Sequence, residues 1–280
     1  MGNDPLITAD WLLEHLKDPH VHVLDATWVP PFLKDRPTGA ALYKAGHIPG
    51  AQYFDIDAIA DKASGLSHML PSAAEFGEAM GRLGIDNEAH IIVYDDNSFF
   101  ASARAWWMFR TMGHDNVQVL DGGLQAWRVA GGAITSDVAT PAPKRFEAEL
   151  NPALMRDQNS MREHVEAQDA KILDARDTGR FNGTAPEPRA GLPSGHMPGS
   201  FCVPAGSLLT PEKTLKPAED LQPILSDFLS TNVVTSCGSG VSAAVISLAL
   251  ARLGKFDVAL YDGSWSEWAA NSENPIATLP

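Results

Sequence analysis

The sequence GHIPGA at residues 46–51 returns as GHMPGS at residues 195–200, 149 positions later in the chain. Two further pairs of segments match in the same order: VHVLDAT (21–27) with AKILDAR (170–176), also 149 apart, and LDGGLQAW (120–127) with YDGSWSEW (261–268), 141 apart. Three ordered matches at a nearly constant offset indicate a tandem duplication of a unit of about 130 residues. Such a unit is too long for a solenoid repeat, so we expect two separate domains.

A segment without periodicity separates the two copies. Residues 138–151 contain two prolines, Pro141 and Pro143, and their composition is typical of an extended, fairly stiff connector. We therefore expect a first domain over residues 1–137, a linker over 138–151 and a second domain over 152–280. A chain of 280 residues, 44% of them hydrophobic, is long enough to build two cores.

Short apolar runs alternate with longer amphipathic stretches in both copies. The runs have the length of buried strands and lie at residues 21–24, 90–94 and 117–120, with counterparts at 171–173, 232–235 and 258–261. The stretches at 103–112 and 241–253 have helical length. This alternation predicts an α/β fold, with two tandem domains that are each a mainly parallel sheet flanked by helices. Ligands of such sheets bind where the carboxyl ends of strands meet the next loop.

Composition excludes several classes of partner. With 21 Lys and Arg against 35 Asp and Glu, the formal charge is −14, and a surface this acidic repels nucleic acid. The longest apolar stretch, near residues 243–253, is shorter than the ~20 residues of a membrane-spanning helix. The two cysteines form no CxxC motif or zinc-type cluster, and the first residues do not resemble a signal peptide. We expect a cytoplasmic protein with free thiols and no metal, membrane or nucleic-acid partner.

One loop carries the candidate chemistry. The apolar run at 232–236 leads directly into CGSGVS at residues 237–242, and an apolar helix follows. Gly238 and Gly240 allow the backbone to curl so that successive N–H groups form an anion-binding nest at the helix N-terminus. A thiol at this place is expected to be largely ionised, which favours Cys237 as a nucleophile. The alternative is that Cys237 is a small buried hydrophobic residue at a strand end.

Together these motifs resemble the tandem rhodanese-type sulfurtransferases. The resemblance rests on the two Leu-Asp-Ala and Gly-His-x-Pro-Gly copies, the Cys237 loop in the second copy and the motif DGSWSEW at 262–268, and it covers nearly the whole chain. More narrowly, CGSGVS is similar to the loop of the 3-mercaptopyruvate sulfurtransferases. Thiosulfate-preferring relatives usually carry Arg and Lys there, and this loop has neither. The segments HMLP (68–71), TGRF (178–181) and EPR (187–189) resemble the same branch.

The resemblance implies two arginines that bind the substrate. They correspond to Arg180 and Arg189, which lie in a segment rich in glycine and proline before the second GHxPG motif. 3-Mercaptopyruvate presents a carboxylate and a keto oxygen, and the planar guanidinium fork suits both. Read without the family, either arginine could equally be a solvated surface charge or part of an ion pair between domains.

The resemblance also implies a proton relay of Ser239, His68 and Asp57. Such a relay would deliver a proton to the departing enolate. Because His68 and Asp57 belong to the first copy and Ser239 to the second, it requires the two domains to face each other. The alternative is that Ser239 is only a small loop residue and that His68 serves the domain interface.

The implied reaction has two halves. The Cys237 thiolate takes the sulfur of 3-mercaptopyruvate, releases pyruvate and becomes a persulfide, while the backbone of Gly238, Gly240, Val241 and Ser242 holds the anions. An acceptor, which could be thioredoxin, a small thiol or cyanide, then removes the outer sulfur. We expect no metal and no organic cofactor.

The first copy is expected to be non-catalytic. Alignment of the two copies places Asp95 at the position of the nucleophile, and a carboxylate cannot form a persulfide. The residues that follow, NSFF at 97–100, lack the glycines of the second loop. We expect the first domain to supply one wall of the active-site cleft.

Three rival functions deserve comparison. A thiosulfate:cyanide sulfurtransferase would use the same chemistry with another donor. A phosphatase or arsenate reductase needs an Arg six positions after the cysteine, where this chain has Ala243. A non-enzymatic persulfide carrier or interaction module would keep the loop and show little turnover.

Overall fold

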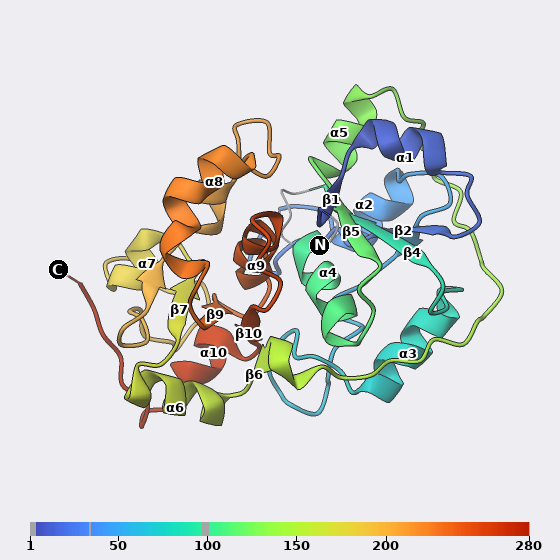
Figure 1. The fold of residues 1–280 in the computed structure, drawn as a ribbon. Coiled ribbons are helices and arrows are strands. Elements are labelled where there is room, and N and C mark those ends of the chain that lie inside the picture. Colours follow the sequence, from blue (N-terminus) through green and yellow to red (C-terminus); the bar gives the residue numbers. More distant parts are fainter. Residues whose placement is uncertain (1–3, 34, 97–100, 280) are drawn as a thin grey trace.

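The computed structural model describes residues 4–33, 35–96 and 101–279. Within them the chain forms two five-stranded sheets in which every pair of neighbouring strands is parallel (Figure 1). The first sheet has the order β1-β5-β4-β2-β3 and the second the order β6-β10-β9-β7-β8, so each strand has a counterpart. The predicted α/β fold with two duplicated parallel sheets is confirmed.

The strands are short, as expected for sheets buried on both faces. In the first sheet they are β1 (Leu6–Ile7), β2 (Val21–Asp25), β3 (Gln52–Tyr53), β4 (His90–Tyr94) and β5 (Val117–Leu120). In the second they are β6 (Met155–Arg156), β7 (Lys171–Asp174), β8 (Phe201–Cys202), β9 (Val233–Ser236) and β10 (Ala259–Tyr261).

Helices connect the strands and cover both sheets. The first domain has α1 (Ala9–His15), α2 (Gly39–Ala45), α3 (Ala73–Arg82), α4 (Ser102–Thr111) and α5 (Gly123–Val129). The second has α6 (Gln158–Ala167), α7 (Thr178–Asn182), α8 (Ala218–Leu225), α9 (Ala243–Arg252) and α10 (Ser264–Trp268), with short 3-10 turns at Pro152–Leu154, Ala205–Leu208 and Ser226–Phe228.

The helix predicted over 241–253 begins later, at Ala243. Val241 and Ser242 belong instead to the loop, because Gly240 adopts a φ of 75° and turns the chain before the helix starts. β9 likewise runs one residue further than predicted and ends at Ser236, directly before Cys237.

The two domains meet along α4 and α9, which pack against each other at the centre of the molecule (Figure 1). Both helices are almost wholly buried, α9 from Ala243 to Ala251, because each lies between its own sheet and the other helix. One hydrophobic cluster therefore extends through both domains and includes Trp106 and Met108 of α4 and Leu248 of α9. Smaller clusters fill the outer faces of the two sheets, around Trp127 and around Trp265.

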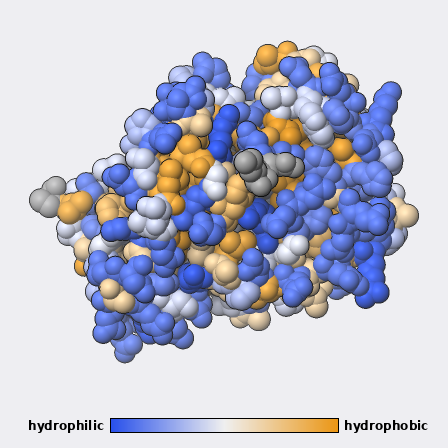
Figure 2. All heavy atoms as spheres, in the orientation of Figure 1, coloured by the Kyte–Doolittle hydropathy of each residue, from blue (hydrophilic) through white to orange (hydrophobic). Residues whose placement is uncertain are grey.

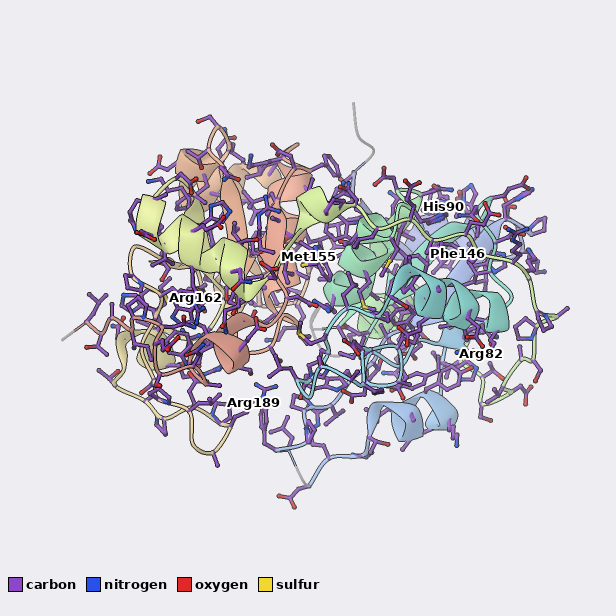
Figure 3. The ribbon with its side chains drawn as sticks, turned by 90° about the horizontal axis from the view of Figure 1, so that it is seen from below. Arg82, His90, Phe146, Met155, Arg162 and Arg189 are labelled. Atoms are coloured by element: carbon purple, nitrogen blue, oxygen red, sulfur yellow. The ribbon has the colours of Figure 1, made fainter. Side chains whose placement is uncertain are left out.

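The segment over residues 138–151 contains no helix or strand and follows the surface of α3 (Figure 3). Phe146 of this segment is buried against Phe76 of α3. Gly77 and Gly81 permit the approach, since a Cβ at these positions would lie 2.7 Å from the carbonyl oxygen of Phe146 and 2.5 Å from that of Lys144. The connector is therefore fixed along its course by packing.

Hydrophilic residues cover most of the face drawn in Figure 2, in keeping with the formal charge of −14. Among the described residues there is no helix with the length and apolar character needed to span a bilayer.

Candidate active site

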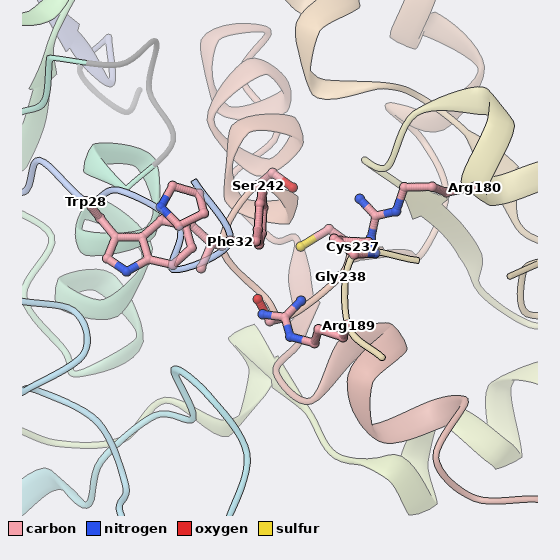
Figure 4. A pocket seen from close by; sticks show the side chains of 11 residues that line it. Trp28, Phe32, Arg180, Arg189, Cys237, Gly238 and Ser242 are labelled. Carbon is pink, nitrogen blue, oxygen red and sulfur yellow. The ribbon is translucent and has the colours of Figure 1, made fainter. Parts of the chain in front are cut away.

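Cys237 lies at the carboxyl end of the central strand β9, where the loop to α9 begins. The residue is only 2% exposed, and its side chain borders a pocket that opens to solvent (Figure 4). Gly240 is required by the curl of the loop, because a Cβ there would lie 2.7 Å from the carbonyl oxygen of Asp262 and 3.0 Å from Nη1 of Arg104. The sequence pattern of strand, Cys loop and helix is thus formed as predicted.

A second loop, which follows β10, forms hydrogen bonds to the backbone of the Cys237 loop. The Oγ of Ser264 accepts a hydrogen bond from the backbone N–H of Cys237 at 3.1 Å and donates one to the carbonyl of Tyr261 at 2.8 Å. The N–H groups of Trp265 and Ser266 donate to the carbonyls of Cys237 and Gly238. The DGSWSEW motif therefore acts as the support of the loop that carries the thiol.

Sequence reasoning did not find the role of Ser264, although the repeat alignment held a signal. Ser264 aligns with Gly123 of the first copy, and both adopt a left-handed backbone, with φ of 49° and 55°. A serine tolerates this conformation poorly and glycine readily. The presence of serine at such a position indicates that its hydroxyl is needed.

The remaining N–H groups of the loop are available to a ligand. In the described part of the chain, the backbone N–H groups of residues 238–242 donate no hydrogen bond to another protein group. They precede the ten-residue helix α9, whose N-terminus carries a partial positive charge. Such a set of oriented N–H groups can stabilise an anion on or near the Cys237 sulfur.

Arg180 of α7 and Arg189 of the following loop both lie beside the Cys237 loop (Figure 4). A Cβ added at Gly238 would lie 3.0 Å from Nη2 of Arg180 and 3.4 Å from Nη1 of Arg189. Burial lowers the pKa of Arg189, and the proximity of Cys237 opposes this effect. Both guanidinium groups can therefore contact an anionic ligand at the thiol.

The first domain supplies the opposite wall of the same pocket. Trp28 and the half-exposed Phe32 face the arginines across the space beside Cys237 (Figure 4). The indole N–H of Trp28 donates to Oδ2 of Asp57 at 2.8 Å. The apolar wall and the cationic wall thus come from different domains.

His68 and Asp57 form a pair at this interface. Nδ1 of the buried His68 lies 3.1 Å from Oδ1 of Asp57, and the imidazole ring packs against the ring of Trp28 in a T-shaped arrangement. The close approach of His68 holds the pKa of Asp57 below its ordinary value. Ser239 lines the pocket next to Cys237, but no hydrogen bond connects the described residues Ser239 and His68. The structure therefore brings two members of the expected relay together and leaves the third unconnected.

A buried arginine that the sequence analysis did not identify connects the loops of the two domains around this pocket. Arg104 of α4 is fully buried and donates to the carbonyl of His68 at 2.5 Å and to that of Gly240 at 3.3 Å. It also pairs with Oδ1 of Asp262 at 2.7 Å, while Oδ2 of Asp262 accepts the N–H of Leu70. One cation of the first domain thus fixes the His68 loop, the Cys237 loop and the support loop. Its only sequence signal was a charged residue in the first turn of a helix that is mostly apolar.

In the first domain, Asp95 stands at the carboxyl end of β4, where Cys237 stands after β9. One carboxylate oxygen, Oδ2, accepts the backbone N–H groups of Ala101 and Ser102, at 3.1 and 2.9 Å, at the start of α4. The first copy therefore uses a carboxylate of its own at the anion-binding end of the helix. The expectation about the sequence NSFF concerns residues 97–100, which lie outside the described residues.

Comparisons with known proteins agree with this geometry. A family model described as a rhodanese-like domain matches residues 8–130 and again 157–271. The chain is 41% identical over 298 residues to thiosulfate/3-mercaptopyruvate sulfurtransferase 2 of Arabidopsis thaliana, covering 98% of this chain and 86% of that protein. It is 41% identical over 280 residues to the 3-mercaptopyruvate sulfurtransferase of Escherichia coli strain K12, covering 99% of both. The crystal structure of SseA from Escherichia coli superposes with a TM-score of 0.85 at 38% identity, over 94% of this chain and 99% of that one.

Proposed function

The chain belongs to the rhodanese family, and we propose that it is a sulfurtransferase that moves the sulfur of 3-mercaptopyruvate to a thiol or cyanide through a persulfide on Cys237. One observation carries the proposal. A single thiol lies at a nest of unpaired backbone N–H groups, with two arginines at 3.0 and 3.4 Å from the Cβ position of Gly238 in the same loop. This arrangement can hold an anionic donor with its sulfur next to the nucleophile.

The arginines bind the donor. A guanidinium can donate two parallel hydrogen bonds to a carboxylate, and 3-mercaptopyruvate has a carboxylate and a keto oxygen on adjacent carbons. Arg189, which forms no ion pair with any described carboxylate, takes the carboxylate, and Arg180 contacts the keto oxygen. The apolar wall of Trp28 and Phe32 excludes water from the reacting sulfur.

In the first half-reaction the Cys237 thiolate attacks the sulfur of the donor. The sulfur–carbon bond breaks, its electron pair forms the enolate of pyruvate, and Cys237 retains the sulfur as a persulfide. A proton is delivered to the enolate by Ser239 and His68, with Asp57 fixing the imidazole through Nδ1. This step requires Ser239 to form a hydrogen bond with His68 when the donor is bound. The N–H groups of Gly238, Gly240, Val241 and Ser242 stabilise the persulfide anion.

In the second half-reaction an acceptor removes the outer sulfur and restores the thiolate. A thiol acceptor leaves as a hydropersulfide and cyanide leaves as thiocyanate, so neither step needs an electron donor or a cofactor. We place thioredoxin among the thiol acceptors. We also place the reaction in a reducing cytoplasm, since both cysteines, Cys202 and Cys237, are free.

Thiosulfate is the second candidate donor, favoured by the double name of the Arabidopsis relative. The Cys237 loop carries no Arg or Lys that would offset the second charge of thiosulfate. We therefore expect kcat/KM to be higher with 3-mercaptopyruvate than with thiosulfate.

Intact-protein mass spectrometry after incubation with either donor tests the proposal. We expect a gain of one sulfur atom from 3-mercaptopyruvate, its loss on addition of a thiol, and no gain in Cys237→Ser. Cys202→Ser is the matched control and should gain sulfur like the wild type. A gain of sulfur from thiosulfate alone would overturn the assignment of 3-mercaptopyruvate as the donor. No gain from either donor would favour a carrier or interaction module that does not react with these donors.

A further inference from the structure

Behind Arg180 lies a chain of buried charges that the proposed reaction does not use. It begins at the buried Asp174 and continues to Arg176, whose side chain is wholly buried and stacks on Trp265 with its guanidinium carbon 4.1 Å from the ring centre. Arg176 donates two hydrogen bonds to the carboxylate of Asp174, one from Nε to Oδ1 at 3.0 Å and one from Nη2 to Oδ2 at 2.6 Å. Nη1 of Arg176 donates to Oε1 of Glu187 at 2.8 Å.

Glu187 joins this inner arginine to the arginine of the pocket. Its side chain is 2% exposed, and its two oxygens accept from Nε and Nη2 of Arg180 at 3.1 and 2.6 Å. The fork of Arg180 is thereby held along one edge, which leaves Nη1 and the second proton of Nη2 for a ligand. Nη2 is also the atom of Arg180 that approaches the Cβ position of Gly238. Glu187 therefore fixes how Arg180 faces the loop of the nucleophile.

The same contacts determine the charge of the pocket. Along the chain from Asp174 through Arg176 and Glu187 to Arg180, two negative charges alternate with two positive ones, so the buried network is neutral. Arg189 forms no ion pair with any carboxylate of the described residues, and it lines the same pocket. Beside the Cys237 thiolate, the pocket thus presents one guanidinium group that no described carboxylate neutralises, although two arginines line it.

We propose that Glu187 is the positioning residue that sets donor choice: by holding Arg180 and cancelling its charge, it matches the site to a donor with one negative charge. 3-Mercaptopyruvate carries one carboxylate, whereas thiosulfate is a dianion whose second charge finds no partner. This inference rests on the proposed sulfurtransferase function and names the feature that selects its donor. Because the pair is buried, its effect on a bound anion is only weakly screened by water.

The test compares kcat/KM for both donors, with cyanide as the common acceptor, in the wild type and in Glu187→Gln. The amide keeps the shape of the side chain and removes its charge. We expect the ratio of 3-mercaptopyruvate to thiosulfate activity to fall at least about tenfold, with a higher KM for 3-mercaptopyruvate. Glu187→Asp keeps the charge and should stay within about threefold of the wild-type ratio even where kcat falls.

Asp177→Asn is the matched control. Asp177 is the other carboxylate near Arg180, at 3.9 Å, but its side chain is 62% exposed, and asparagine preserves its helix-capping role. Its donor ratio should change less than about twofold, because water screens the exposed pair. Equal loss with both donors in a folded Glu187→Gln protein would show that Glu187 is only structural and would overturn the inference.

A wild-type measurement covers the case in which Glu187→Gln does not fold. Pyruvate and sulfate, a monoanion and a dianion, are compared as competitive inhibitors of the first half-reaction. We expect pyruvate to inhibit at the lower concentration, and tighter inhibition by sulfate would overturn the single-charge pocket. A wild type that gains no sulfur from 3-mercaptopyruvate would instead refute the proposed function, so the two failures are distinguishable.

Discussion

The two domains share one sheet order but treat the same helix terminus in opposite ways. In the first, the carboxylate of Asp95 accepts the N–H groups of Ala101 and Ser102 at the start of α4. In the second, Cys237 occupies the equivalent strand end, and the N–H groups of residues 238–242 are left for a ligand. The fold thus provides an anion site twice, and chemistry is possible only where the protein does not fill it.

A second difference lies in the loop that supports each site. Gly123 and Ser264 share a left-handed backbone, and an Ala-like side chain in this conformation costs about 1 kcal/mol or more. In the second copy this cost is offset by a hydroxyl that accepts the N–H of Cys237. The first copy has no thiol to support and keeps glycine.

The third difference is the residue that comes directly after the repeated Leu-Asp-Ala motif. Asp174 is succeeded two residues later by Arg176, which pairs with it, whereas Asp25 is succeeded by Thr27. Burial therefore raises the pKa of Asp25 above its ordinary value. The buried aspartate is common to both copies, and in the second copy Arg176 and Glu187 connect it to Arg180 beside the Cys237 pocket.

The largest effect is expected from the nucleophile itself. Cys237→Ser should lower turnover of 3-mercaptopyruvate about 10⁴-fold or more, because the hydroxyl cannot carry the sulfur. Adding Asp95→Cys to this variant should not restore activity, since Arg180 and Arg189 line the pocket of Cys237 in the second domain. Steady-state assays with cyanide measure both changes, and restored turnover in the double variant would show that the two loops are equivalent.

The next effect concerns the cation that ties the domains together. Arg104→Met should destabilise the protein by about 3–5 kcal/mol, because it leaves the buried Asp262 without its partner. Arg82→Met, at a 63% exposed side chain of α3, is the control and should change stability by less than about 0.5 kcal/mol. Urea unfolding compares the two, and similar stabilities would contradict a buried clamp.

The repeated aspartates should respond differently to the same substitution. Asp174→Asn breaks a buried ion pair and should cost about 3 kcal/mol, whereas Asp25→Asn should be within about 1 kcal/mol of neutral at pH 7. The raised pKa means that native Asp25 takes up a proton more readily than the unfolded chain does. Wild-type stability should therefore gain from this group as the pH falls from neutral toward about 4, and Asp25→Asn should lack that gain. Denaturant titrations at several pH values measure both.

The smallest effect is expected at Asp57. Its pKa is held low by His68, so its contribution to stability is present above the ordinary value of about 4 and is lost as the pH falls through the lowered folded value. The contribution should be below about 1 kcal/mol, since the side chain is 52% exposed. Asp57→Asn should flatten this acid limb of the stability curve. An unchanged limb in the variant would mean that the His68 pair does not contribute to folding.

Much of this site could be read from the residues before any coordinates. The duplication predicted two sheets of the same kind, and the glycine pattern placed Cys237 at the head of a helix. The contacts of Arg104 with Asp262 and Gly240 could not be predicted, because they exist only once α4 and α9 pack and bring loops of different domains together. Glu187 was quoted as part of a motif, yet its pairing with Arg180 depends on how the segment between α7 and β8 folds back.

The packing of α4 against α9 also bears on how such a duplicated chain can change over time. The second domain buries α9 completely only with the help of the first, so deleting the first domain would expose the apolar face of α9 that packs on α4. Whatever residue stands at the end of β4, the apolar surface of α4 is needed to cover α9. The first copy is therefore part of the hydrophobic core of the second, independently of any chemistry of its own.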